Sequence, residues 1–267
     1  MIENRTETRG AAHLRQLWAQ DRPAFGLWSL LADPVVAELV AGTDVDFAVV
    51  DLQHGFATFS ELPTLLQAMR SGGMAPIVRV PWNDPAQIMR AADSGAAGVL
   101  VPMVNSAAEA AAAVDACRFP PQGSRSWGPM WGGIRADGAP APEVANAAML
   151  CFVMVETRHG IDALEEIVAV PGVDGVFIGP NDLALSCGHG RATYRDSDAV
   201  VRLLDQVIAA CAAGGVVPGL FCSDEEMALH WAGRGARLLS AGVDTGLLRA
   251  GADALSSELA IGAERTR

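Results

Sequence analysis

The sequence predicts a single (β/α)₈ barrel, and three observations carry that prediction. Short apolar runs alternate with segments of helix-like apolar spacing along the whole chain. Most of the runs are continuously apolar, which is typical of strands buried on both faces of a parallel sheet. The chain has 267 residues, and barrels of about 250 residues usually form one domain. A doubly wound sheet is the alternative, but no G-x-G-x-x-G follows the first run.

The expected elements follow one another in a regular order. The strands are expected at residues 25–29, 47–52, 76–80, 98–102, 151–156, 175–179, 216–221 and 237–241. Helical spacing occurs between them, for example at residues 61–70, 85–93, 107–117, 160–168, 199–213 and 223–232. A polar segment, residues 1–22, precedes the barrel. Because composition does not change along the chain, we expect one domain spanning residues 1–267.

One long segment, residues 119–148, departs from this alternation. It is rich in Pro, Gly and Ala and contains Trp127 and Trp131. Loops longer than about 12–15 residues are uncommon and tend to be functional or disordered. Two interpretations stay open: an exposed excursion, or a lid or subunit contact that covers the tryptophans.

Charge and cysteine content restrict the partners and the compartment. The formal net charge is -12, so the chain should repel nucleic-acid phosphates. No run reaches the roughly 18 apolar residues of a membrane span, and residues 1–22 lack the apolar centre of a signal peptide. The 5 cysteines are widely spaced and form no C-x-x-C. We therefore expect a cytoplasmic protein with reduced thiols, no nucleic acid and no membrane.

The basic residues exclude three kinds of cofactor chemistry. All 19 are Arg, and the chain contains no Lys. A Schiff-base enzyme needs a lysine amine, and so does the internal aldimine of a pyridoxal phosphate enzyme. The P-loop that binds nucleotides needs one as well. The sequence therefore predicts no Schiff-base lysine, no pyridoxal phosphate and no nucleotide.

Two acidic residues at the ends of neighbouring strands indicate a metal site. The reactive groups of a barrel lie at the carboxyl ends of its strands, where Glu156 ends the fifth strand and Asp182 follows the sixth. Adjacent strands lie about 5 Å apart, and two carboxylates that close repel unless a cation separates them. Oxygen ligands favour Mg²⁺ or Mn²⁺, with Co²⁺ as a further candidate. The alternative is that each carboxylate pairs with an arginine at the rim.

A histidine and an arginine at the same end of the barrel indicate acid–base and electrostatic chemistry. His54 follows the second strand with Asp51 before it and Gly55 after it, which suits a base that needs an acidic partner and room for substrate. Arg79 ends the third strand and could stabilise an oxyanion. A structural histidine and a structural ion pair are the alternatives. By spacing alone Asp93 is a solvated residue. The four remaining histidines have no comparable setting.

Six motifs in this chain resemble the HpcH/HpaI aldolases, the family of 4-hydroxy-2-oxoheptanedioate and 2-keto-3-deoxy sugar acid aldolases. Each motif alone is weak, but the six occur in the same order from about residue 26 to residue 246. They are DLQHG at 51–55, VRVPWN at 78–83, GVLVPMVN at 98–105, PPQGSRS at 120–126, VET at 155–157 and GPNDL at 179–183.

The resemblance implies a role for each catalytic and metal-binding candidate. Glu156 and Asp182 match the metal ligands of the family. His54 matches its catalytic histidine, and Asp51 matches the nearby acid. Arg79 matches the arginine at the ketone and enolate oxygen of the substrate.

The resemblance also implies a substrate pocket and an assembly. The segment Gly179, Pro180 and Asn181 matches the backbone that holds the substrate carboxylate, and Trp28 matches a pocket wall. Asp93 matches an acid that a neighbouring subunit sets against the histidine. The family forms hexamers with an exchanged C-terminal helix, so we expect a homo-oligomer, a trimer or hexamer, with residues 251–264 exchanged.

Two positions depart from the family pattern. Gln53 stands where the family commonly has Glu, and Met154 stands where it often has Gln. Both positions lie one layer away from the substrate in the family picture, so they leave the pH optimum and the choice of acceptor open.

The expected function is therefore that of a metal-dependent (class II) aldolase. It would reversibly cleave a 4-hydroxy-2-oxo acid to pyruvate, or a substituted pyruvate such as hydroxypyruvate, and an aldehyde. One alternative is an acyl-CoA carbon–carbon lyase of the citrate lyase β or malyl-CoA type, which would need a basic groove that this acidic chain hardly offers. The other is a non-catalytic barrel that binds 2-oxo acids.

Overall fold

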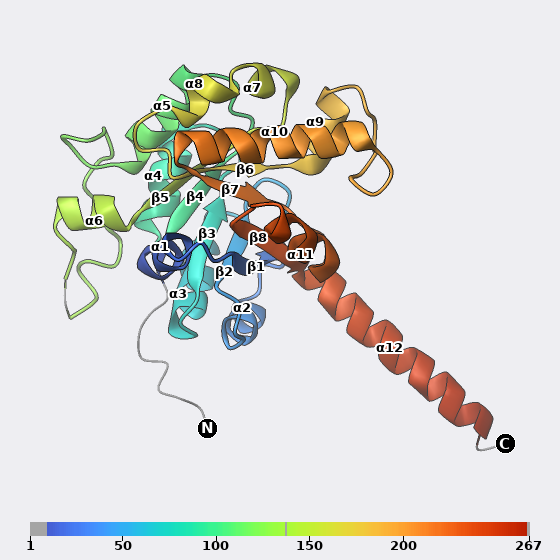
Figure 1. Ribbon diagram of the computed structural model, residues 1–267. Helices are drawn as coiled ribbons and strands as arrows, with labels where there is room; N and C mark the ends of the chain where they lie inside the picture. Colours follow the sequence, from blue (N-terminus) through green and yellow to red (C-terminus); the bar gives the residue numbers. More distant parts are fainter. Residues whose placement is uncertain (1–9, 137, 266–267) are drawn as a thin grey trace.

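The computed structural model describes residues 10–136 and 138–265, and within them eight parallel strands close into a barrel in chain order (Figure 1). The strands are β1 (Ala24–Ser29), β2 (Phe47–Asp51), β3 (Ala75–Arg79), β4 (Gly98–Val101), β5 (Leu150–Met154), β6 (Gly175–Ile178), β7 (Val217–Leu220) and β8 (Leu238–Val243). Each bound lies within two residues of the expected one. The predicted (β/α)₈ barrel is confirmed.

Helices connect the strands and surround the barrel. They are α1 (Ala11–Ala19), α2 (Pro34–Ala41), α3 (Leu62–Ser71), α4 (Pro85–Asp93), α5 (Ala107–Cys117), α6 (Pro142–Ala148), α7 (Arg158–Asp162), α8 (Leu164–Val168), α9 (Pro180–Ser186), α10 (Asp198–Gly214), α11 (Glu225–Gly233) and α12 (Asp244–Arg265). The helix expected at 160–168 is instead two short helices that meet at Ala163. No helix in the described residues is long and apolar enough to cross a bilayer.

Two apolar cores lie on the two faces of the closed sheet. One fills the inside of the barrel and includes Phe47, Ile77 and Phe152. The other lies between the strands and the surrounding helices. Because the strands are buried on both faces, their sequences are continuously apolar. Glycine makes room for large interior rings, since a Cβ on Gly26 would lie 2.6 Å from the ring of Phe47.

Helix α1 covers the amino end of the barrel, contrary to the expectation of a polar segment at residues 1–22. Ala11, Leu14 and Leu17 are buried against the interior core. Their spacing of three residues gives α1 an apolar face, which the polar residues between them conceal in the sequence. The first nine residues of that segment lie outside the described part of the chain.

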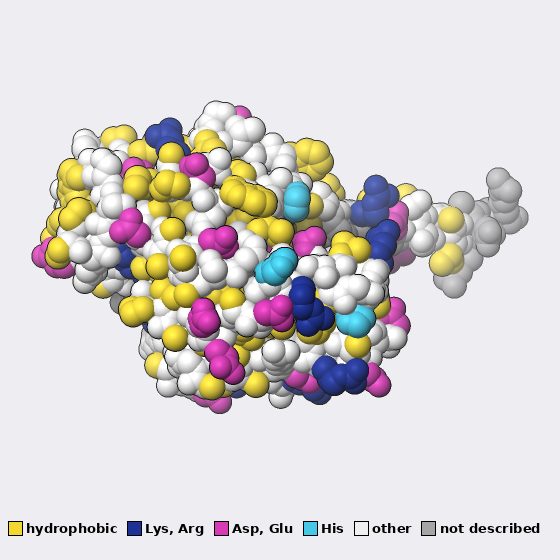
Figure 2. All heavy atoms as spheres, turned by 90° about the horizontal axis from the view of Figure 1, so that it is seen from above, with side chains coloured by type: hydrophobic (Ala, Val, Ile, Leu, Met, Phe, Trp, Pro, Cys, Tyr) yellow, Lys and Arg dark blue, Asp and Glu magenta, His cyan; other side chains and the backbone are white. Residues whose placement is uncertain are grey.

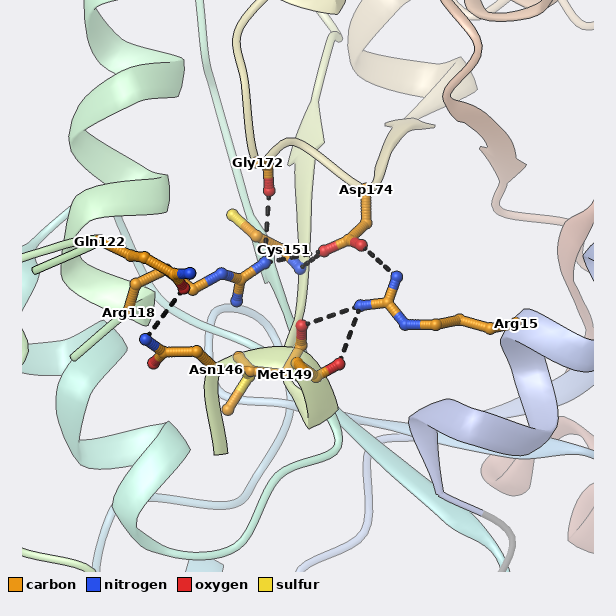
Figure 3. A network of polar contacts seen from close by, with 9 residues as sticks. Arg15, Arg118, Gln122, Asn146, Met149, Cys151, Gly172 and Asp174 are labelled. Carbon is orange, nitrogen blue, oxygen red and sulfur yellow. Dashed lines mark hydrogen bonds and ion pairs between the residues drawn. The ribbon is translucent and has the colours of Figure 1, made fainter. Parts of the chain in front are cut away.

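A half-buried carboxylate ties α1 to the strands (Figure 3). Asp174, just before β6, accepts hydrogen bonds from Arg15 of α1 at 2.6 Å and from Arg118 at 3.1 Å. The same carboxylate accepts from the backbone N–H of Cys151 at 2.8 Å. Arg15 also donates to the carbonyl oxygen of Met149 at 3.2 Å. These contacts fix the amino ends of β5 and β6, whose opposite ends carry the candidate metal ligands.

The segment at residues 119–148 lies to one side of the barrel and contains α6 (Figure 1). Its two tryptophans differ in exposure. The Nε1 of Trp131 donates to the carbonyl oxygen of Ser94 at 2.7 Å, whereas Trp127 is 53% exposed. The segment therefore combines one tryptophan that is hydrogen-bonded to the end of α4 with one that lies on the surface.

Helix α12 projects away from the barrel as an arm (Figure 1). It begins seven residues before the expected helix at 251–264. Leu248, Leu255 and Leu259 are 69%, 58% and 66% exposed on it. An isolated helix gains little from its own barrel, so α12 presents an apolar surface without cover in this chain.

Candidate active site

A cavity of about 220 Å³ opens at the carboxyl end of the barrel, and we call it the mouth cavity. The sequence-predicted site residues line it, except for Glu156 and Asp93. The predicted residues that line the cavity are Trp28, Asp51, His54, Arg79, Gly179, Pro180, Asn181 and Asp182. Strands β1, β2, β3 and β6 therefore bring these residues together as the barrel prediction required.

Asp51 and Arg79 form a buried ion pair at the floor of the mouth cavity. The carboxylate of Asp51 accepts from Arg79 Nε at 2.9 Å and from Arg79 Nη2 at 2.5 Å. It also accepts from Nε1 of Trp28 at 3.1 Å. Burial raises the pKa of Asp51, but the hydrogen bonds and the positive charge of Arg79 outweigh it and the pKa is lowered. Asp51 is therefore held as a carboxylate.

The same carboxylate shapes the turn that carries His54. Asp51 Oδ1 accepts from the backbone N–H groups of Gln53 at 2.9 Å and His54 at 3.1 Å. The hydrogen bond between Asp51 and His54 is therefore made by the backbone N–H of His54. From the sequence, Asp51 was expected to orient the imidazole ring instead. The side chain of His54 is exposed at the cavity mouth. Asp51 positions Arg79 and this turn together.

The guanidinium of Arg79 is fixed from two sides. Its Cζ lies 4.9 Å from the centre of the Trp28 ring, and its side chain is only 10% exposed. Trp28 in turn packs edge-on against Phe221, with ring centres 5.1 Å apart. A planar cation held in this way is preorganised to meet negative charge that develops in the cavity.

Glu156 lies just beyond β5, buried beside the cavity floor. One oxygen, Oε1, accepts from the backbone N–H of Met103 at 2.9 Å, and Met103 adopts the left-handed region with φ of 58°. The other oxygen, Oε2, is buried and finds no hydrogen-bond partner among the described residues. Burial raises the pKa of Glu156 to about 7, and the negative charge of Asp182 adds to that rise. A buried carboxylate oxygen without a partner is costly.

Gly179 makes room for that oxygen at the end of β6. A Cβ at this position would collide with Glu156 Oε2. Directly after it, α9 begins at Pro180, and Asp182 lies in its first turn with an exposed side chain. The two acids therefore approach from adjacent strands, close enough for the charge of Asp182 to act on Glu156.

Asp93 lies away from the mouth cavity. It ends α4 at the amino end of the barrel, where its Oδ1 pairs with Arg125 Nη2 at 2.7 Å. Both residues line another cavity, of about 320 Å³, together with Trp127 and Trp131. Within one chain Asp93 and His54 therefore sit at opposite ends of the barrel.

Some cavity residues were missed in the sequence. Leu30, Phe221 and Val243 also line the mouth cavity. Leu30 follows Trp28, and Phe221 follows Gly219, at the two-residue spacing of strand positions that face one side. Extending that alternation beyond the strand ends would have identified Leu30 and Phe221, whereas Val243 follows a register shift between β8 and β1 that breaks the alternation. Met154 and Gln53 are the two positions that depart from the family pattern. Met154 lines the cavity, whereas the backbone N–H of Gln53 donates to Asp51.

Comparisons with known proteins agree on one family. The model of the family described as HpcH/HpaI aldolase/citrate lyase matches residues 24–250. A hydroxypyruvate/pyruvate aldolase of Rhizorhabdus wittichii is 36% identical over 239 residues, which cover 90% of this chain and 95% of that protein. A 4-hydroxy-2-oxo-heptane-1,7-dioate aldolase of Klebsiella pneumoniae is 38% identical, with 92% of each chain covered. A solved HpcH/HpaI aldolase/citrate lyase family protein of Burkholderia cenocepacia is similar with a TM-score of 0.85 and 32% identity, covering 92% of this chain and 98% of that one.

Proposed function

This chain belongs to the HpcH/HpaI aldolase/citrate lyase family, and we propose that it is a metal-dependent aldolase acting on 4-hydroxy-2-oxo acids. It is a carbon–carbon lyase that releases pyruvate or a substituted pyruvate, such as hydroxypyruvate, together with an aldehyde. The relatives named for hydroxypyruvate/pyruvate and for 4-hydroxy-2-oxo-heptane-1,7-dioate support this substrate class.

One observation carries the metal dependence: the buried Oε2 of Glu156, which has no partner among the described residues. Because Gly179 has no Cβ, there is room beside that oxygen at the end of β6. A hard divalent cation, Mg²⁺ or Mn²⁺ and also Co²⁺, fits a pair of carboxylates. Within the described chain no three His, Cys, Asp or Glu side chains gather as a ready metal cluster. Glu156 and Asp182 would therefore hold the cation together with water and substrate oxygens.

The bound cation would supply Lewis-acid polarisation of the 2-oxo group. The protein would supply the remaining steps. The backbone N–H groups of Gly179 and Asn181 are expected to hold the substrate carboxylate; Pro180 between them has no N–H to donate. Trp28 and Phe221 form the wall of the cavity.

In the cleavage direction His54 takes the proton of the C4 hydroxyl, directly or through water. The C3–C4 bond then breaks, its electron pair passes to C3 and the 2-oxo oxygen as an enolate, and the aldehyde leaves. The fixed guanidinium of Arg79 stabilises the enolate oxygen. Protonation of C3 completes pyruvate. Asp51 acts by holding Arg79 and the turn of His54 in place. Decarboxylation of oxaloacetate would use the same enolate and is expected as a side activity.

The assembly is proposed as a homo-oligomer, a trimer or hexamer. Asp93 cannot reach His54 of its own chain from the opposite end of the barrel, so its expected role requires a neighbouring copy. The exposed apolar residues of α12 support an exchanged helix as the contact. We also propose a cytoplasmic location. All 5 cysteines lie in the described residues as free thiols, as is usual in a reducing compartment.

The two alternative functions fit the molecule less well. Acyl-CoA lyases need cations for nucleotide phosphates, whereas the basic side chains on the face in Figure 2 are dispersed among apolar and acidic ones. A non-catalytic binder would not need an exposed histidine opposite a buried arginine and an unpaired carboxylate oxygen.

A retro-aldol assay with a panel of 4-hydroxy-2-oxo acids, read as pyruvate release, tests the proposal. We expect activity that disappears in excess EDTA and returns with Mg²⁺, Mn²⁺ or Co²⁺. The His54→Ala variant should lose about 10²–10⁴-fold in rate, as expected for loss of a general base. Full activity in EDTA rejects the metal, and near-normal turnover of His54→Ala removes the histidine from catalysis.

A further inference from the structure

A smaller cavity of about 90 Å³ adjoins the mouth cavity, and we call it the side pocket. The two cavities share three lining residues, Pro180, Asn181 and Phe221. The volume is several times that needed by one water molecule. A molecule bound at the reaction centre therefore has a second space beside it, beyond Phe221.

The floor of the side pocket is apolar and fixed. Val200 and Leu204 of α10 and Met227 of α11 line it, and all three are buried. Ala192, in the connection between α9 and α10, also lines the pocket and is only half-buried. The pocket is therefore preformed in helices that belong to the core, with one wall on a loop.

The only arginine that lines the side pocket within the described chain is already neutralised. Arg195 donates to Asp224 at 3.3 Å and to Glu226 at 3.2 Å, and its guanidinium lies over the ring of Tyr194. Two carboxylates thus face one cation, so the local charge is negative. A carboxylate or phosphate group on a ligand would meet repulsion here, whereas a methylene chain would meet the apolar floor.

We propose that the side pocket binds the apolar tail of the acceptor aldehyde and so selects aldehydes by chain length. The inference rests on the proposed function, in which the 2-oxo acid end of the substrate lies among Asp182, Arg79 and the backbone at Gly179. The aldehyde end then lies on the side of Phe221, which borders both cavities. Phe221 is held edge-on against Trp28 and forms a fixed edge between the two cavities that the tail would pass.

The first experiment follows carbon–carbon bond formation from pyruvate and linear aldehydes, from acetaldehyde to pentanal, with Mg²⁺ present. A methylene in an apolar pocket is worth about 10-fold or more in kcat/KM, so kcat/KM should rise by about that factor per added carbon until the pocket is filled. A flat series overturns the proposal. Succinic semialdehyde, which carries a carboxylate on a tail of similar length, should be a poorer acceptor than pentanal. A preference for it also overturns the proposal.

The second experiment fills the pocket from its loop side. Ala192→Phe should lower kcat/KM for pentanal by about 10-fold or more relative to kcat/KM for acetaldehyde. Arg191→Phe is the matched control, because it adds the same ring one position away at an exposed residue that does not line the pocket. Equal losses for both aldehydes, or equal losses in both variants, contradict the proposal. A wild-type protein that converts no aldehyde at all would instead refute the aldolase function itself.

Discussion

Gly179 is the residue on which the candidate metal site depends most directly. Any side chain there meets Glu156 Oε2. In the Gly179→Ala variant the Glu156 carboxylate must leave its present position. We expect weakened Mn²⁺ binding by titration calorimetry and a loss of about 10²-fold in activity, the size of effect that a small misplacement causes.

The control for that substitution is Gly133→Ala. A Cβ at Gly133 meets nothing within 4 Å, so the same methyl group should change neither quantity. Unaltered Mn²⁺ affinity in Gly179→Ala would show that Glu156 Oε2 is not directed at a cation.

A second prediction concerns the contribution of Asp51 to the free energy of unfolding. Asp51→Asn leaves the guanidinium of Arg79 buried without its counter-charge, which typically costs about 3–5 kcal/mol in the free energy of unfolding. Urea denaturation measures it. A loss below about 1 kcal/mol would mean that the pair contributes no more than an exposed one.

The same carboxylate predicts the direction of the pH dependence. Its folded pKa lies below the usual value, and the unfolded value is about 3.9. The stabilisation is therefore fully present above about pH 4 and is lost as the pH falls through the folded pKa. Asp51→Asn should flatten the stability curve in that acid range, and a curve parallel to wild type contradicts the assignment.

Single site residues could be predicted from the sequence where they stand at the carboxyl end of a predicted strand. Asp51, Arg79 and Asp182 follow from their positions at strand ends, because parallel strands deliver their carboxyl ends to one side. The open oxygen of Glu156 was not predictable, because it depends on the left-handed backbone of Met103 and the missing Cβ of Gly179. The pairing of Asp93 with Arg125 joins two segments whose approach no local pattern encodes.

Among the elements, α1 shows how a short amphipathic helix closes the barrel. Arg15→Ala removes its hydrogen bonds to Asp174 and Met149. A hydrogen bond to a charged group contributes about 1.5–3 kcal/mol. Arg15 is 41% exposed and Arg118 still pairs with Asp174, so we expect the lower end of that range in urea denaturation. Arg22→Ala, on an exposed residue just after α1, should have no measurable effect.

Strands were predicted better than helices for a physical reason. A strand buried on both faces must be apolar throughout, and turns bound it closely. Helix α12 contains Gly246 and Gly251. Glycine has a low helix propensity, so the sequence did not predict the first turns of this helix. Helix α1 hides its apolar face among polar residues. The break at Ala163 between α7 and α8 has no marker in the sequence.

The whole molecule leaves the apolar residues of α12 uncovered, and a second copy of the chain is the proposed cover. Leu255→Glu puts a charge among Leu248 and Leu259, which lie on the same side of the helix. Light scattering after gel filtration should give a multiple of 27.8 kDa for wild type and a smaller mass for this variant. Ser256→Glu adds the same charge at the neighbouring position and should leave the mass unchanged. A monomeric wild type rejects the assembly.

The opposed positions of Asp93 and His54 allow the assembly and the chemistry to be tested together. If Asp93 acts on the histidine of a neighbouring copy, the His54→Ala variant and the Asp93→Asn variant should each have low aldolase activity alone. Hybrids purified through one tag on each variant would contain sites with both native residues, because each variant supplies what the other lacks. Activity in the hybrid well above that of either parent is the expected outcome. Mixing the two purified proteins without subunit exchange is the control. A hybrid no more active than its parents would leave Asp93 with its ion pair to Arg125 alone, as a residue that stabilises the amino end of the barrel and takes no part in the reaction.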